Sequence, residues 1–393
     1  MSWSGNSLPR YGPSGSHSPS YEASRHHPTS PTQPARLPAH RSPSAVPENS
    51  QPVTGPASCR LDDSTMKSFR ISRTLQETKG IVNSVDFSPT GEHVLTATDD
   101  ESIVVYECLS VDKPKVHRLC NSKKYGVDNA IYTHSTIAAL HSSTKVDDNI
   151  RYLNLQENKY ISVFSGHTKR VTELHQSPVD DQFLSASVDR TIRLWDHRAG
   201  CTGMLTNLDT TPILTIDPEG LIFAAGHCTT RENRIMLYDI RNYQKGSFST
   251  FRYPEESDAD WCGMEVSPDG RYLLVNTNGF VVYIMDAFQG SCRFCFRGHA
   301  NRGQSLKASF TPDSQYVLIG STDGKLHIWN LRTGRNVAVL APKQKDLFHK
   351  IVKFHPTNAL AVSAGNKVSF WLPYIVDQAN SSGYSSNRSP GQW

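Results

Sequence analysis

His167 and Asp189 are residue types that could form an acid–base dyad, with Ser185 or Ser187 as a hydroxyl partner. They also fit a structural role, because an Asp189 buried in a tight turn can accept a hydrogen bond from His167. The second imidazole nitrogen can reach Ser185 or Ser187, and that hydroxyl can reach the indole N–H of Trp195. Such a chain satisfies polar groups that would each cost about 1–3 kcal/mol if buried alone. We therefore predict a structural network and no catalytic dyad.

Cys292 and Cys295 form a C-x-x-C, a spacing that can hold a metal ion or a redox-active dithiol. No second cysteine pair lies near it in the sequence, and no histidine cluster accompanies it. Positions three apart on a strand also point to opposite faces. We therefore expect no metal and no cofactor, and we expect the eight cysteines to be reduced thiols.

The residues of the predicted network lie in one stretch, from Ser165 to Asp196, which contains three short strand-like runs separated by turns. Its turn at Ser177-Pro178 has counterparts at later prolines spaced 40 to 50 residues apart, and one gap of 89 residues precedes it. Strand ends similar to Trp195-Asp196 then define seven units. A unit that runs from Gly-His to Trp-Asp resembles a WD repeat, one four-stranded blade of a β-propeller. The sequence therefore predicts an all-β fold, a seven-bladed WD-repeat β-propeller.

The seventh unit has only three predicted strands, at about 348–354, 359–363 and 367–372. We expect an early strand at about 68–75 to supply the fourth, because this closure removes the open sheet edges. The propeller would span residues 66–377.

Residues 1–65 contain 11 of the 23 prolines and 14 serines, and they have almost no aliphatic side chains. We predict a disordered extension there and a flexible tail at 378–393.

The sequence has no apolar run long enough for a membrane span, which predicts a soluble intracellular protein. The net charge of +4 favours no particular partner, and the basic pairs near Lys124 and Arg170 are flanked by acids. We expect no membrane and no direct nucleic-acid binding.

Five segments sharpen the resemblance, because WD repeats usually diverge outside their turns. They are SKKYGVD at 122–128, DDNIRYL at 147–153, DPEGLIFAAG at 217–226, ASFTPDSQ at 308–315 and FWLP at 370–373. Together they resemble the Swd2-like family of WD-repeat subunits of COMPASS histone methyltransferase complexes. The similarity covers about 67–377 and departs from the family at 227–233 and 343–350.

This resemblance implies a nuclear scaffold with no chemistry of its own. It also implies partners: the SET-domain enzyme that methylates histone H3 lysine 4, other COMPASS subunits, the targeting subunit of a nuclear protein phosphatase, and RNA polymerase II with its phosphorylated C-terminal repeat. The residues agree on catalysis, because the sequence lacks a G-x-S-x-G elbow, a Gly-rich phosphate loop and an H-E-x-x-H.

A partner peptide would bind at the loops that ring one mouth of the propeller channel, where aromatic and cationic side chains are the usual anchors. The candidates are Lys124, Tyr125, Arg170, Trp261 and Arg302. Trp261 could instead begin a buried strand.

An alternative function comes from Trp195-Asp196-His197-Arg198, which resembles the box of cullin ubiquitin ligase substrate receptors. In such receptors, the arginine projects from the blade rim to an adaptor protein. The opposing interpretation is that a polar arginine simply follows many blade strands.

Overall fold

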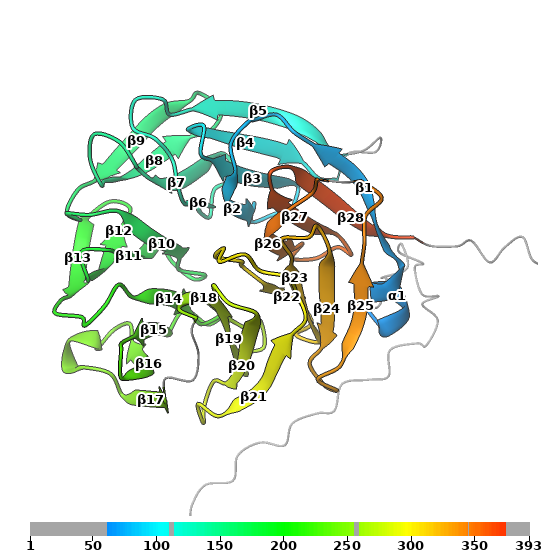
Figure 1. The fold of residues 1–393 in the computed structure, drawn as a ribbon. Helices are drawn as coiled ribbons and strands as arrows, with labels where there is room; N and C mark the ends of the chain where they lie inside the picture. The colour runs from blue at the N-terminus through cyan, green and yellow to red at the C-terminus, as the bar shows by residue number, and fades with distance from the viewer. Residues whose placement is uncertain (1–60, 110–113, 255–258, 345, 375–393) are drawn as a thin grey trace, which may run out of the picture. The chain divides into compact units, whose positions relative to one another are not determined.

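The computed structural model describes residues 61–109, 114–254, 259–344 and 346–374. These residues form seven four-stranded antiparallel sheets arranged as blades around a central channel (Figure 1). The predicted seven-bladed propeller is confirmed. Residues 1–60 of the predicted extension and the tail at 378–393 lie outside the described residues. None of the helices in the described chain is long and apolar enough to cross a membrane.

Each blade is an antiparallel meander that runs from the channel outward. The strands of blades one to four are β2 (Val82–Phe87), β3 (His93–Thr98), β4 (Ser102–Glu107) and β5 (Lys115–Asn121); β6 (Ala130–Tyr132), β7 (Ala138–Ser142), β8 (Ile150–Asn154) and β9 (Lys159–Phe164); β10 (Val171–Gln176), β11 (Gln182–Ser187), β12 (Ile192–Asp196) and β13 (Gly200–Leu205); β14 (Ile213–Ile216), β15 (Ile222–Cys228), β16 (Glu232–Asp239) and β17 (Ser249–Pro254).

The strands of blades five to seven are β18 (Trp261–Val266), β19 (Tyr272–Thr277), β20 (Val281–Asp286) and β21 (Cys292–Arg297); β22 (Ser309–Phe310), β23 (Tyr316–Gly320), β24 (Leu326–Asn330) and β25 (Asn336–Leu340); β26 (His349–Phe354), β27 (Ala361–Gly365), β28 (Val368–Pro373) and β1 (Phe69–Leu75). Two short helices accompany them, α1 (Asp63–Ser68) and η1 (Tyr243–Lys245).

The hydrophobic core lies between blades. Seven clusters of buried side chains each combine residues from two neighbouring blades, and one of them joins blade seven to blade one. The second and third strands have core on both faces, so strands such as β23 and β27 are buried along their whole length. The outermost strands are mostly exposed, as β9 is, where only Phe164 is buried. A blade therefore buries its two faces only by contacting both neighbours.

The two ends of the described chain close the ring. β1 pairs antiparallel with β28, from Phe69 opposite Pro373 to Leu75 opposite Val368 (Figure 1). The buried side chains of Met66 and Phe69 pack between blades six and seven. The predicted closing strand is confirmed as an outer strand of blade seven.

Residues 61–65 were predicted to belong to the extension, and the structure corrects that boundary. Asp62 caps α1 by accepting a hydrogen bond from the Thr65 amide at 2.7 Å. The Asp63 carboxylate accepts from the Tyr316 hydroxyl at 2.8 Å and from the Asn330 amide at 3.0 Å. These residues therefore tie the chain to blade six. A six-residue helix is too short to show a periodic pattern in the sequence.

The expected geometry of Cys292 and Cys295 was also wrong. β21 contains a bulge, because Phe294 opposes Ile284 while Cys292 opposes Met285. The extra residue restores the two side chains to one face, and their sulfur atoms lie 3.4 Å apart. Within the described residues, no group of three or more His, Cys, Asp or Glu side chains is arranged to hold a metal ion.

We predict that the closing segment is needed for a soluble ring. Deleting residues 1–60 should leave the melting temperature unchanged, because α1 and β1 remain. Deleting residues 1–76 should expose the edge of β28 and the core under Met66 and Phe69. We expect aggregation, or a melting temperature lower by more than about 5 °C, in size-exclusion chromatography and thermal denaturation.

The substitution Asp63→Ala separates the contribution of α1 from that of the β1 strand. It removes the acceptor shared by Tyr316 and Asn330, so we expect a loss of about 1–3 kcal/mol in the free energy of unfolding with the ring still monomeric. A soluble 1–76 deletion that melts like the parent would contradict the closure.

Candidate peptide-binding face

The predicted network exists in blade three. His167 Nδ1 lies 2.8 Å from Asp189 Oδ2, and His167 Nε2 lies 2.7 Å from Ser185 Oγ. Trp195 Nε1 donates to the same Ser185 oxygen at 2.8 Å. Ser187 does not belong to this hydrogen-bonded network, because its hydroxyl donates to the Lys169 carbonyl at 2.7 Å. The geometry thus selects Ser185 as the relay between the imidazole and the indole.

Electrostatics also fit a structural role for this network. Burial favours a protonated Asp189, but hydrogen bonds from Thr191, His167 and the Thr168 amide outweigh it and lower the pKa of Asp189 to about 2. Burial lowers the pKa of His167, and Asp189 only partly opposes that effect. The pair is therefore a carboxylate beside a neutral imidazole, with every ring nitrogen occupied.

A related network in blade seven was not predicted. Trp371 Nε1 donates to Ser363 Oγ at 2.7 Å, and His349 Nδ1 lies 3.0 Å from the same oxygen. His349 comes from the start of β26 and not from a Gly-His loop, so the sequence pattern did not find it. The usable signal is a serine on the second strand followed by a tryptophan on the third.

Blade six lacks such a network. Ile319 occupies the position that corresponds to Ser185, so no hydroxyl is available between His299 and Trp329. His299 is buried and follows Gly298 as His167 follows Gly166, but the serine that the role of His167 requires is missing in this blade.

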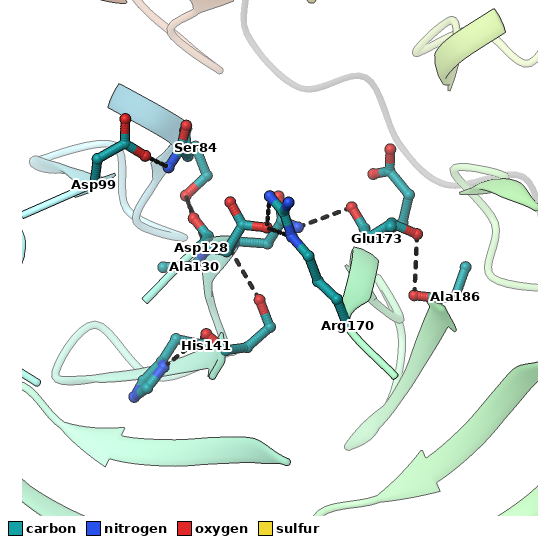
Figure 2. Close-up of polar contacts among 12 residues, drawn as sticks. Ser84, Asp99, Asp128, Ala130, His141, Arg170, Glu173 and Ala186 are labelled. Atoms are coloured by element: carbon teal, nitrogen blue, oxygen red, sulfur yellow. Dashed lines mark hydrogen bonds and ion pairs between the residues drawn. The ribbon is translucent and has the colours of Figure 1, made fainter. Parts of the chain in front are cut away.

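The loops that enter each blade lie on one side of the ring, here called the loop face, and carry Lys124, Tyr125, Arg170 and Arg302. Arg170 reaches across to the neighbouring blade (Figure 2). Its Nη2 and Nε atoms lie 2.7 and 2.9 Å from Asp128 Oδ2. The Arg170 side chain remains 62% exposed, so it also faces solvent at the channel mouth. Arg170 is therefore an ion-paired residue with one accessible side.

Further groups at this mouth were missed by the sequence analysis. Lys350 Nζ donates to Asn83 Oδ1 at 2.7 Å, and the Asn83 amide donates to Asp99. Ser84 Oγ accepts from the Ala130 amide at 2.8 Å and so joins blade one to blade two (Figure 2). Besides Arg170 and Asp128, the mouth thus carries a cation, Lys350, and an anion, Asp99, linked through Asn83.

Below the mouth, a cavity of about 320 Å³ in the channel holds charged side chains from the innermost strands. Lys307 Nζ lies 3.4 Å from Glu173 Oε2, and Lys353 Nζ lies 3.8 Å from Glu265 Oε1. Burial raises the pKa of Glu265, which the nearby Lys353 only partly offsets. Burial also favours protonated Glu173, but Lys307 and His175 outweigh it and lower its pKa. The signal in the sequence is a charge within an otherwise apolar first strand, such as Glu265 in WCGMEV.

Of the remaining candidates, Tyr125 and Lys124 lie against neighbouring side chains, whereas Arg302 is exposed on a loop. Tyr125 packs against Arg151, whose guanidinium carbon lies 3.6 Å from the ring centroid, and Lys124 Nζ lies 5.0 Å from it. Arg302 is exposed on the β21–β22 loop. In the part of the chain that the structure describes, no hydrogen bond or ion pair joins these residues to Arg170.

Trp261 is removed from the peptide-binding candidates. It is 7% exposed and belongs to the core between blades four and five, where its ring makes an edge contact with Tyr253. The interpretation of Trp261 as the start of a buried strand is the correct one, because it is the first residue of β18.

The Trp195-Asp196-His197-Arg198 box is only partly accessible. Trp195 is buried, and Asp196 Oδ1 accepts from the amides of Arg198 and Ala199 at 2.8 Å each. The Arg198 side chain is 88% exposed and lies 3.8 Å from Asp181. Of Trp195, Asp196 and Arg198, Arg198 is thus the one whose side chain is largely exposed, although it lies within ion-pair distance of Asp181.

Comparison with known proteins places these features in context. The WD domain, G-beta repeat family matches residues 69–107, 158–196 and 290–330. WD repeat-containing protein 82 of Drosophila melanogaster is 46% identical over 316 residues, which are 80% of this chain and 97% of that protein. COMPASS component SWD2 of Saccharomyces cerevisiae is 32% identical over 312 residues, 76% of this chain and 92% of that protein. Set1 complex component swd2 of Schizosaccharomyces pombe is 38% identical over 217 residues, 54% of this chain and 58% of that protein.

We predict that the blade-three network contributes stability and not binding. Asp189→Ala removes a partner of buried His167, so the free energy of unfolding should fall by about 1–3 kcal/mol in urea denaturation. Asp323→Ala is the matched control, because it changes the equivalent position of blade six, where Ile319 interrupts the network. The control should cost less. An Asp189→Ala protein with unchanged stability and no partner binding would instead place Asp189 in a binding site.

We also predict a loss of stability in mild acid. His141, His227, His299 and His349 are buried, and burial lowers the pKa of each to about 4. Between about pH 6.5 and about pH 4 the unfolded chain therefore binds protons that the folded chain does not. The free energy of unfolding should fall as the pH falls through this window, by up to about 1.4 kcal/mol per pH unit for each histidine.

Urea unfolding at about pH 7 and about pH 5 measures this dependence. His349→Gln should reduce the slope, while His117→Gln, which changes an exposed side chain, should leave it unchanged. A free energy of unfolding that is the same at both pH values would contradict the assignment of neutral buried histidines.

Proposed function

This chain belongs to the Swd2-like family that includes WD repeat-containing protein 82, and from that premise we propose that it is a non-catalytic scaffold subunit of a nuclear histone H3 lysine-4 methyltransferase complex. The similarity to COMPASS component SWD2 and to Set1 complex component swd2 carries this proposal. The network of His167, Asp189 and Ser185 supports the non-catalytic part, because the imidazole is buried and both of its nitrogens have partners.

The SET-domain methyltransferase would bind as a short extended segment on the loop face. A closed propeller presents its loops from a rigid frame, which lowers the entropic cost of ordering a binding surface. Lys124, Tyr125, Arg302 and the exposed side of Arg170 supply cationic and aromatic contacts. Such contacts suit an acidic segment or one that contains proline.

The same face is proposed to serve two further partners, the targeting subunit of a nuclear protein phosphatase and the phosphorylated C-terminal repeat of RNA polymerase II. A phosphorylated segment would add charge-assisted hydrogen bonds to lysine and arginine side chains. If these partners share the face, they compete for it, which would place the chain in separate complexes.

The alternative, a substrate receptor of a cullin ubiquitin ligase, depends on the exposed guanidinium of Arg198. Arg241, two residues after Asp239 in the next blade, supports the same pattern. Affinity purification from nuclei distinguishes the two functions: recovery of methyltransferase subunits supports the scaffold, and recovery of a cullin adaptor alone, lost in Arg198→Ala, supports the receptor.

We predict that cations of the loop face hold the methyltransferase. The double variant Lys124→Glu and Arg302→Glu should weaken capture of a methyltransferase fragment at least about tenfold in a binding titration. Its melting temperature should not change, because both side chains are exposed and surface substitutions usually stay within about 0.5 kcal/mol. Arg170 is tested by Arg170→Ala, because a glutamate there would face Asp128.

The matched control is Arg73→Glu with Lys245→Glu, which makes the same charge change at two exposed positions, on β1 and η1, for which the described residues include no ion pair. The control should bind the fragment normally. Equal affinity of both double variants and of Arg170→Ala for the fragment would move the site away from the loop face.

A further inference from the structure

A groove opens between blades four and five on the side of the ring opposite the loop face, here called the turn face. In an antiparallel meander, the turns after the first and third strands lie at the same end. The turns β14–β15 and β18–β19 and the connections β16–β17 and β20–β21 therefore border one groove, between two adjacent blades in Figure 1. Its volume is about 450 Å³, and its floor includes the buried side chains of Ala224, Leu237 and Leu273.

Two phenylalanines in this groove are exposed to solvent. Phe248 is 59% exposed and Phe288 is 78% exposed. Both backbones are fixed: the Phe248 amide donates to the Leu237 carbonyl at 3.0 Å, and the Phe288 amide donates to Asp286 Oδ1 at 3.0 Å. Folding thus buries little of either ring, although the amide hydrogen bonds fix the backbone that carries each one. Exposed apolar surface of this kind, next to an apolar floor, is typical of interaction sites.

The rim of the groove is acidic. Asp217, Glu219 and Asp269 line it, and among the described residues no lysine or arginine does. Asp217 accepts hydrogen bonds from two amides of its own turn, and Arg271 approaches Asp269 at 3.7 Å and offsets one charge. For Glu219 the described chain offers no hydrogen bond or ion pair of the side chain, so its carboxylate is available. The groove therefore combines an apolar interior with a net negative rim.

We propose that this groove is a docking site for a short segment of a partner protein that carries a bulky apolar side chain between basic residues. The apolar side chain would lie against Phe248 and Phe288 over the floor, and the flanking cations would face Glu219 and Asp217. A second copy of this chain would bring a second acidic rim, so like charges oppose a dimer through the groove. The site is on the other face from the proposed methyltransferase site and does not depend on it.

Fluorescence anisotropy with the full chain tests this proposal. The probe is a labelled hexapeptide KRLFKR, with EELFEE and KRSSKR as matched probes that lack the basic or the apolar residues. We expect KRLFKR to bind with a dissociation constant on the order of 100 µM and both matched probes to bind at least about tenfold more weakly. Affinity for KRLFKR should fall several-fold between about 50 and about 300 mM salt.

The variants change only exposed residues of the groove, so we expect them to fold as the parent does. The double variant Phe248→Ser and Phe288→Ser, and separately Glu219→Lys, should each weaken KRLFKR binding, the first at least about tenfold. Phe280→Ser is the control, since Phe280 is 63% exposed on the β19–β20 loop of the loop face. Melting curves of all variants should match the parent.

Four results would overturn the proposal. Unchanged binding in the phenylalanine double variant would place the probe elsewhere, and equal affinity for EELFEE would remove the charge argument. Tighter KRLFKR binding after deletion of residues 1–60 would show that this chain's own N-terminal segment occupies the groove. A concentration-dependent dimer that is lost in Phe288→Ser would assign the groove to a second copy.

Discussion

The pairing of β1 with β28 is the constraint on which the rest of the structure depends. No blade has a hydrophobic core of its own, because each of the seven buried clusters is shared by two neighbouring blades. Opening the ring at one place would therefore expose apolar surface on both sides of the gap. The chain ends meet at one antiparallel seam, and α1 extends that seam through Asp63 to the hydroxyl of Tyr316. A ring closed in this way has no exposed inner edges. It can therefore hold the loop face and the turn face rigidly.

Polar networks inside the ring add specificity at particular blades. In blade three, four side chains satisfy one another, and the imidazole of His167 stays neutral because burial outweighs the nearby carboxylate. In blade six, Ile319 replaces the serine, and packing takes over from hydrogen bonding. The repeats thus share one fold, but hydrogen bonds stabilise the interior of blade three and apolar packing stabilises that of blade six. This difference is why a substitution at equivalent aspartates is expected to have unequal effects in the two blades.

Much of this structure could be predicted because WD repeats place turns and strand ends at regular intervals. The strands of blade three, the closing strand and the partners of His167 follow from local spacing. Three features did not follow. The choice of Ser185 over Ser187 depends on which of two same-face hydroxyls lies under the imidazole, the sulfur contact of Cys292 and Cys295 depends on a bulge, and the Arg170–Asp128 pair joins residues from different blades. Each is set by register or by blade packing, which the sequence pattern does not encode.

A scaffold must hold at least two partners without overlap, and the two faces of this ring differ in chemistry in a way that permits it. The loop face offers Lys124, Arg302 and a partly exposed Arg170, which suit acidic segments. The turn face offers two exposed phenylalanines within an acidic rim, which suit basic and apolar segments. A segment that matches one face carries the wrong charge for the other, so electrostatics alone discourages exchange between them. The closed ring keeps the two surfaces at a fixed separation, and occupancy of one need not disturb the other.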